Sequence, residues 1–242
     1  MNETDTTTEI SDTKMGKSED KMTSTEAKTV KPKADQDQVQ TNYVGEVERR
    51  ILAVQQNPET AALVAKRMFN AEKLTEGLGL VAAFQGELSE RQQTLGQVRG
   101  ASAALTTGLD EAKAAVTEFR ESVRLAYPGD RALQQTLGVT ERVPQDQEKF
   151  LLYARTCAAT AKKAPYAQAL TAAGFEITAY ESKIDAFATA RTDFLLAEQA
   201  AKSATVARDD AFKVLKTWAV SFHRALKLAL KARLDLLKPL GL

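Results

Sequence analysis

The side chains best suited to acid–base or nucleophilic chemistry are one histidine, His223, and one cysteine, Cys157. A catalytic thiolate–imidazole pair needs the two groups within hydrogen-bond reach and a third group that orients the base. Cys157 falls on the apolar stripe of a predicted helix, a position that favours a small core residue. His223 follows Phe222 beside another apolar stripe, where its ring can bury one edge and hydrate the other. We therefore expect both residues to be structural.

Metal and cofactor chemistry has equally little support in the sequence. One histidine cannot supply the Glu-x-x-His motifs that a di-iron bundle takes from two helices, and one cysteine excludes a disulfide or a cysteine-rich metal site within the chain. No phosphate-binding glycine loop, Gly-x-Ser-x-Gly or metalloprotease motif is present. We predict a non-enzymatic protein with no catalytic residue, no metal, no cofactor and no small-molecule substrate.

The most strongly patterned stretch of the chain is 205–230. Its apolar residues recur at alternating steps of three and four, which places them on one seam of a helix: Phe212, Leu215, Ala219, Phe222, Leu226 and Ala229. The pattern predicts a helix that is buried or packed against a partner.

The carboxyl end carries the one clear charge asymmetry, because residues 213–242 hold seven basic side chains and a single acidic one. Leu226, Leu230, Leu234 and Leu237 would form an apolar strip beside this basic face, as in a helix that binds anionic membrane or, less favoured, nucleic acid. An ordinary core helix gives a similar pattern, because lysines complement the negative helix end. The candidate interaction residues are Trp218, Arg224, Lys227, Lys231, Arg233 and Lys238.

Composition favours an all-helical protein. The hydrophobic share of 43% is inflated by 40 alanines, which raise helix propensity and favour close helix packing over a bulky core. A net charge of +1 gives no global attraction to nucleic acid or membrane. The sequence contains no signal-peptide core and no apolar run long enough to span a bilayer, and its single cysteine fits a reducing compartment, so we expect a soluble cytoplasmic protein.

The first 42 residues hold nine acidic and six lysine side chains and few large apolar ones. Such a segment cannot bury enough surface to offset its ordering entropy, so 1–42 is predicted to be a disordered polar tail. A first helix follows from Tyr43, on the stripe Val44, Val47, Ile51 and Val54. Asn57 and Pro58 are typical of a helix start, and a short helix is expected over 61–69.

A long periodic segment then runs over 72–126 and ends at Pro128-Gly129, where Asp130 can cap a short helix that Gly138 stops. The unbroken apolar phase favours one helix of about 55 residues, some 80 Å long. Four glycines, each costing about 1 kcal/mol in a helix, leave a hairpin near 96–102 as the alternative. The same choice applies to 176–230, where Arg191, Glu198, Thr205 and Arg208 interrupt the apolar seam and indicate a wetter, bent or turned region.

The chain is internally similar at a constant offset of 103 residues. Matches in register include Val81 with Ile184, Phe84 with Phe187, Phe119 with Phe222, and Leu137-Gly138 with Leu240-Gly241. We infer a duplicated unit of about 100 residues rather than a solenoid, whose repeats are shorter.

The sequence therefore predicts an all-α, two-fold duplicated antiparallel helical bundle or coiled coil with long helices. A helical repeat over 43–139 and a second over 140–242 would pack as one unit. The predicted function is structural or scaffolding, through association with protein partners or with itself. Peripheral binding to anionic membrane or nucleic acid through the basic carboxyl-terminal helix is the alternative.

Overall fold

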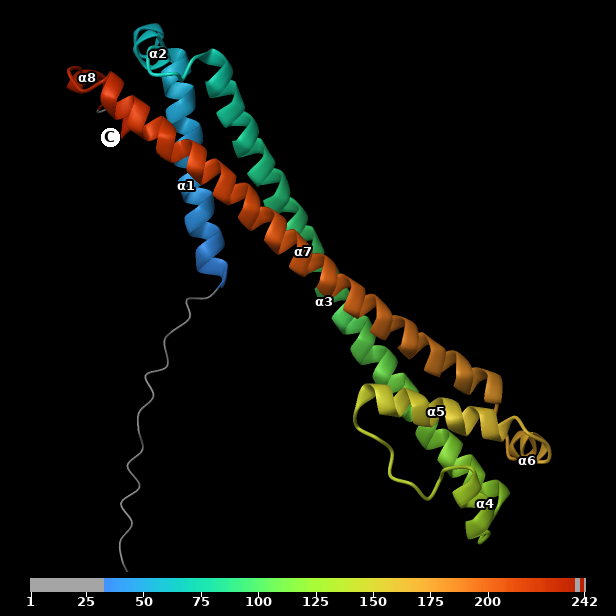
Figure 1. The fold of residues 1–242 in the computed structure, drawn as a ribbon. Coiled ribbons are helices and arrows are strands. Elements are labelled where there is room, and N and C mark those ends of the chain that lie inside the picture. The colour runs from blue at the N-terminus through green and yellow to red at the C-terminus, as the bar shows by residue number, and fades with distance from the viewer. Residues whose placement is uncertain (1–32, 238–239, 242) are drawn as a thin grey trace, which may run out of the picture. The chain divides into compact units, whose positions relative to one another are not determined.

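The computed structural model describes the backbone of residues 33–237, 240 and 241, and in this part of the chain all regular elements are helices (Figure 1). In chain order they are α1 (Lys33–Gln56), α2 (Pro58–Ala65), α3 (Ala71–Ala126), α4 (Arg131–Thr136), α5 (Gln147–Ala161), α6 (Tyr166–Ala172), α7 (Ile177–Ala229) and α8 (Leu234–Leu237). The all-α class expected from composition is confirmed. Residues from Gln40 onward form one compact unit, to which the following description applies.

The predicted tail is too long by ten residues, because α1 already begins at Lys33 and so includes residues 33–42. The mixed polar composition of that stretch hid its helical character. The remainder of the predicted tail lies outside the described residues.

Side-chain caps fix most of the helix starts that the sequence suggested. The Asn57 Oδ1 atom accepts hydrogen bonds from the backbone N–H groups of Glu59 and Thr60, and Pro58 occupies the first helical turn. Asp130 Oδ1 accepts from the N–H of Leu133 at the start of α4. The short helix predicted over 61–69 instead spans Pro58–Ala65, so its cap was predicted correctly and its end was not.

Both long segments are single helices, so the hairpin and loop alternatives are wrong. The polar residues in the second seam do not break α7. Arg208 is only 3% exposed, and the Thr205 hydroxyl accepts a hydrogen bond from Arg91 Nε at 3.3 Å. The side chains of Arg191 and Glu198 are partly exposed, so this part of the seam is wetter, as predicted. Buried arginines with hydrogen-bonding partners replace apolar seam residues without interrupting the helix.

The long helices α3 and α7 lie side by side and run in opposite directions (Figure 1). Phe84 packs on Phe212 with ring centroids 5.7 Å apart, Gly108 lies against Phe187, and Phe119 packs on Tyr180 at 5.5 Å. Residues later in α3 therefore contact residues earlier in α7.

Two separate hydrophobic cores form at the two ends of this helix pair. The core of the α1 end combines α1, α2, the first turns of α3, the last turns of α7 and the chain's carboxyl terminus: Val44, Val47, Ile51, Val54, Val64, Leu74, Val81, Phe84, Leu215, Trp218, Ala219, Phe222, Leu226, Leu230 and Leu240. The core of the α5 end combines the last turns of α3, residues Leu137 and Val139, α5, α6 and the first turns of α7. Each core thus draws on both predicted repeats. Phe84 and Phe119 are about 50 Å apart along α3, given about 1.5 Å per residue.

The predicted continuous carboxyl-terminal amphipathic helix is shorter than expected. Helix α7 ends at Ala229, and residues 234–237 form the separate short helix α8. Leu226 and Leu230 are fully buried in the core of the α1 end, so they do not form an exposed apolar strip. Within residues 33–237, no helix combines the length and apolarity that crossing a lipid bilayer requires.

Candidate functional site

The two residues that the sequence offered for nucleophilic chemistry lie in different cores. Cys157 is 2% exposed within the core of the α5 end, where burial raises the pKa of its thiol. His223 lies at the α1 end of the molecule, on the last turns of α7. Within the described residues, no cluster of three or more His, Cys, Asp or Glu side chains is arranged to hold a metal ion. The structure therefore brings together none of the groups considered for catalysis.

His223 instead pairs with Arg50, and Arg50 joins three parts of the α1 end. The His223 Nε2 atom lies 2.8 Å from Arg50 Nη1, and because a guanidinium can only donate, the imidazole accepts and is neutral. Burial lowers the pKa of His223, and the nearby cation of Arg50 lowers it further. Arg50 also donates to the carbonyl oxygens of Leu240 (3.1 Å) and Gly241 (3.3 Å), which ties the carboxyl terminus to α1.

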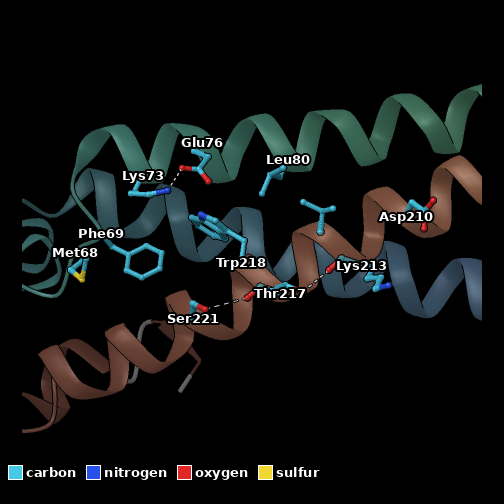
Figure 2. A pocket seen from close by; sticks show the side chains of 11 residues that line it. Met68, Phe69, Lys73, Glu76, Leu80, Asp210, Lys213, Thr217, Trp218 and Ser221 are labelled. Atoms are coloured by element: carbon cyan, nitrogen blue, oxygen red, sulfur yellow. Dashed lines mark hydrogen bonds and ion pairs between the residues drawn. The ribbon is translucent and has the colours of Figure 1, made fainter.

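An open groove of about 780 Å³ is present at the α1 end. It lies between the loop after α2, the first turns of α3 and residues 210–221 of α7, as Figure 2 shows. The side chains that line it are mostly apolar at the floor and charged at the rim: Met68, Phe69, Lys73, Glu76, Leu80, Asp210, Lys213, Val214, Thr217, Trp218 and Ser221.

The floor of the groove is an aromatic cluster centred on Trp218. Its ring stacks on Phe222 with centroids 5.0 Å apart and meets Phe69 edge-on at 5.5 Å. Gly77 makes room for the indole, because a Cβ atom at that position would lie 2.3 Å from Cη2 of the ring. Trp218 is 9% exposed, and its Nε1–H group is buried without a hydrogen-bond partner. Such a donor normally finds a partner when buried.

Met68, at the mouth of the groove, has an unusual backbone. Its φ of 70° lies in the left-handed region, where a non-glycine residue costs roughly 1–2 kcal/mol. Glycines occupy this conformation after the other short helices, at Gly138, Gly174 and Gly241. The Met68 side chain is 85% exposed, so no packing of its own offsets the strain. Strain of this kind concentrates at functional sites.

A basic face runs along α7 beside the groove. The side chains of Lys213, Lys216, Arg224, Lys227 and Lys231 are exposed, and none forms a salt bridge within the part of the chain that the structure describes. Aliphatic side chains lie among them on the same face: Val214 (53% exposed), Val220 (41%) and Leu228 (60%). We call these eight residues the basic face.

The predicted interaction residues are divided by the structure. Arg224, Lys227 and Lys231 belong to the basic face, whereas Trp218 forms the floor of the groove. Arg233 is held by ion pairs with Glu59 and Asp235, and Lys238 lies outside the described residues. Sequence reasoning missed Met68, Phe69 and Lys73. The one local signal was that no glycine stands between α2 and Asn70, the cap of α3, although a chain reversal after a helix usually uses one.

No protein-family model, curated protein or solved structure matches this chain. Its function can therefore be inferred only from its own residues and their arrangement.

Proposed function

We propose that this chain is a non-enzymatic structural or scaffolding protein of the cytoplasm that acts through protein–protein association, with other proteins or with a second copy of itself. The observation that carries the proposal is the pair of separate hydrophobic cores at the two ends of α3 and α7. Their nearest buried members on α3, Phe84 and Leu105, are about 32 Å apart, given about 1.5 Å per residue. An apolar groove opens at one of the cores. A rigid helical spacer between two folded ends suits a protein that holds partners at a distance.

We further propose that the fold is a two-fold duplicated antiparallel coiled coil. Support comes from positions separated by 103 residues, which have the same burial or backbone conformation at both ends. Gly138 and Gly241 both adopt positive φ, at 75° and 66°. Five seam pairs are at most 2% exposed: Val81/Ile184, Phe84/Phe187, Ala112/Leu215, Phe119/Phe222 and Val123/Leu226.

Site-specific photo-crosslinking in cells tests the scaffolding proposal. A photoreactive residue would replace Thr217 at the α1 end, Ala114 at the α5 end or Ser203 in the middle of α7, all three of which are exposed. We expect discrete protein adducts, including adducts to a second copy, from one or both ends and none from Ser203. Absence of adducts at both ends, with a monomer at every concentration in sedimentation equilibrium, would contradict the proposal.

Binding to anionic membrane is a second candidate, favoured by the five cations of the basic face that have no acidic partner in the described structure. Nucleic acid binding is a weaker form of the same idea. Flotation with vesicles containing phosphatidylglycerol, and co-sedimentation with duplex DNA, would be compared at low and high salt. Salt-sensitive binding that the double variant Lys216→Glu, Lys227→Glu abolishes would support it, and absence of binding would remove it.

A further inference from the structure

We propose that the groove at the α1 end binds one amphipathic helix of a partner protein, whose apolar side chains enter the groove and whose flanking residues are acidic. This inference rests on the proposed scaffolding function and specifies where and by what chemistry one partner docks. It commits to a helix because the groove is bounded by two helices and runs along one of them (Figure 2).

The dimensions of the groove match a short helix. Its α7 wall extends from Asp210 to Ser221, which is about three helical turns or about 17 Å. Helices that dock in grooves present apolar residues at spacings of three, four and seven positions, and three turns accommodate three such anchors. The floor already resembles an interface core, because the rings of Trp218 and Phe69 and the side chain of Leu80 are its apolar surface.

Two features of the groove are unfavourable without a partner. The buried Trp218 Nε1–H group has no acceptor, and Met68 is strained and exposed at the mouth. A docked helix would cover the Met68 side chain with apolar surface.

The charged side chains at the rim of the groove determine which charge the flanking residues of the partner helix should carry. Lys213 projects at the groove and Arg224 lies beyond its Ser221 end, and neither has an acidic partner in the described structure. Lys73 is already paired with Glu76 at 2.5 Å, and Asp210 is the one acidic residue on the α7 wall. Acidic flanks therefore complement Lys213, one turn from the Asp210 end of the groove, and Arg224 beyond its other end.

The charge pattern is not a requirement of the helix pair. At the positions 103 residues earlier, α3 has Asp110 in place of Lys213, Glu111 in place of Val214, and Glu121 in place of Arg224. Those positions are on the outside of α3 in the same way, and Asp110, Glu111 and Glu121 are exposed. At these three positions, the basic and apolar character is therefore found on α7 and not on α3.

A membrane surface fits these observations less well than a helix does. A bilayer could contact Val220, Leu228 and the lysines of the basic face, but it cannot enter a concave groove to reach Trp218. The exposed aliphatic residues there are valines and a leucine, and the chain's one tryptophan is buried. Anionic vesicles are therefore one arm of the test.

The test uses a phage-displayed library of helical peptides about 16 residues long, with leucine anchors at spacings of three and four and all other positions drawn equally from Glu, Lys, Gln and Ala. Selected peptides would be titrated into the full-length protein and followed by the emission of Trp218, which reports on the groove directly because it is the only tryptophan in the chain. Vesicles containing phosphatidylglycerol would be titrated in parallel.

We expect the selected peptides to be enriched in Glu at the flanks and to shift Trp218 emission. Affinity should fall at least about tenfold in Val214→Glu, which blocks the groove, and in Lys213→Glu combined with Arg224→Glu, which reverses the rim. Lys113→Glu, an exposed change at the α5 end, is the control and should leave affinity unchanged. These three variants alter exposed positions, so folding should be preserved.

Several results would overturn the inference. Selected peptides without enrichment in Glu, or peptides whose affinity Val214→Glu does not reduce, would contradict it. So would a library that yields no peptide binding at the groove, or evidence that a second copy of this chain occupies the groove. A Trp218 shift with vesicles but not with peptides would assign the surface to membrane instead. Photo-crosslinks at other surfaces would preserve the scaffolding function while this groove assignment failed, so the two failures are distinguishable.

Discussion

Replacing Gly77 with alanine should destabilise the protein although alanine is the better helix former. Gly77 lies within α3 and faces Trp218 across the helix pair. A Cβ atom there would lie 2.3 Å from Cη2 and 2.4 Å from Cζ2 of the indole, closer than carbon atoms can approach. The indole would have to move away from Phe222 and Phe69, with which it packs at 5.0 and 5.5 Å.

The magnitude follows from two opposing effects. Overpacking in a core costs about 1–3 kcal/mol, and each aromatic pair disturbed is worth about 0.5–1.5 kcal/mol. Alanine regains about 1 kcal/mol of helix propensity. The Gly77→Ala variant should therefore lose about 1–2 kcal/mol. Gly79→Ala is the internal control, because a Cβ there meets nothing within 4 Å and only the gain of up to about 1 kcal/mol applies.

Urea denaturation followed by far-UV circular dichroism measures both variants against the parent protein. The difference between Gly77→Ala and Gly79→Ala is the decisive quantity, about 2 kcal/mol or more, since helix propensity cancels in it. In a Trp218→Leu background, Gly77→Ala should become stabilising because the clash is gone. If the two alanine variants have equal stability, or if Trp218→Leu does not change the sign, the packing described for the floor of the groove is wrong.

Three further predictions concern the two ends of the molecule. Met68→Gly should stabilise the protein by about 1 kcal/mol, or about 2–4 °C in Tm, because glycine adopts the positive φ without strain. Gly174→Met should destabilise it by a similar amount. Equal and opposite changes in calorimetry would support the strain at Met68, and a destabilised Met68→Gly variant would contradict it. Because burial lowers the pKa of His223 below its unfolded value of about 6.5, protonation favours the unfolded state. The contribution of His223 to stability should therefore be fully present above about pH 7 and be lost as pH decreases below 6.5. His223→Gln should flatten that part of the urea-midpoint profile, and an unchanged slope would show that other groups titrate there. Phe222→Ala and Phe119→Ala each remove a fully buried ring and should lower the free energy of unfolding by about 3–5 kcal/mol. Native-state hydrogen exchange should accelerate mainly at the α1 end in Phe222→Ala and mainly at the α5 end in Phe119→Ala. Equal acceleration at both ends would show that the two ends unfold as one cooperative unit.

Much of the fold follows from local sequence signals. The alanine content and the unbroken apolar phase of 84–126 predict long helices, and both α3 and α7 are continuous. Asn57 and Asp130 cap α2 and α4 as expected, and Gly138 ends α4 with a φ of 75°. These features depend on neighbours within one or two turns, which is why a sequence alone can specify them.

Features that depend on tertiary contacts could not be predicted. Arg208 was expected in a wet or turned region, yet it is buried, because hydrogen-bonding partners in the folded state decide its burial and no local pattern reports them. The break after Ala229 and the ion pairs of Arg233 likewise depend on contacts far away in sequence, including Glu59. The groove arises from α2, α3 and α7 together, so only one of its residues, Trp218, was singled out beforehand.

Both ends contain an aromatic cluster, but the residue at the centre of the cluster and the turn beside it differ between them. At the α5 end the Tyr180 hydroxyl donates to the Ala154 carbonyl oxygen at 3.0 Å, and the helix before the cluster ends on Gly174, which adopts positive φ without strain. At the α1 end the buried N–H of Trp218 has no acceptor and Met68 takes the strained conformation. Each defect costs about 1–3 kcal/mol, a large fraction of the stability of a folded domain. Both defects lie at the same apolar groove, and a binding role for this groove explains why they coincide there.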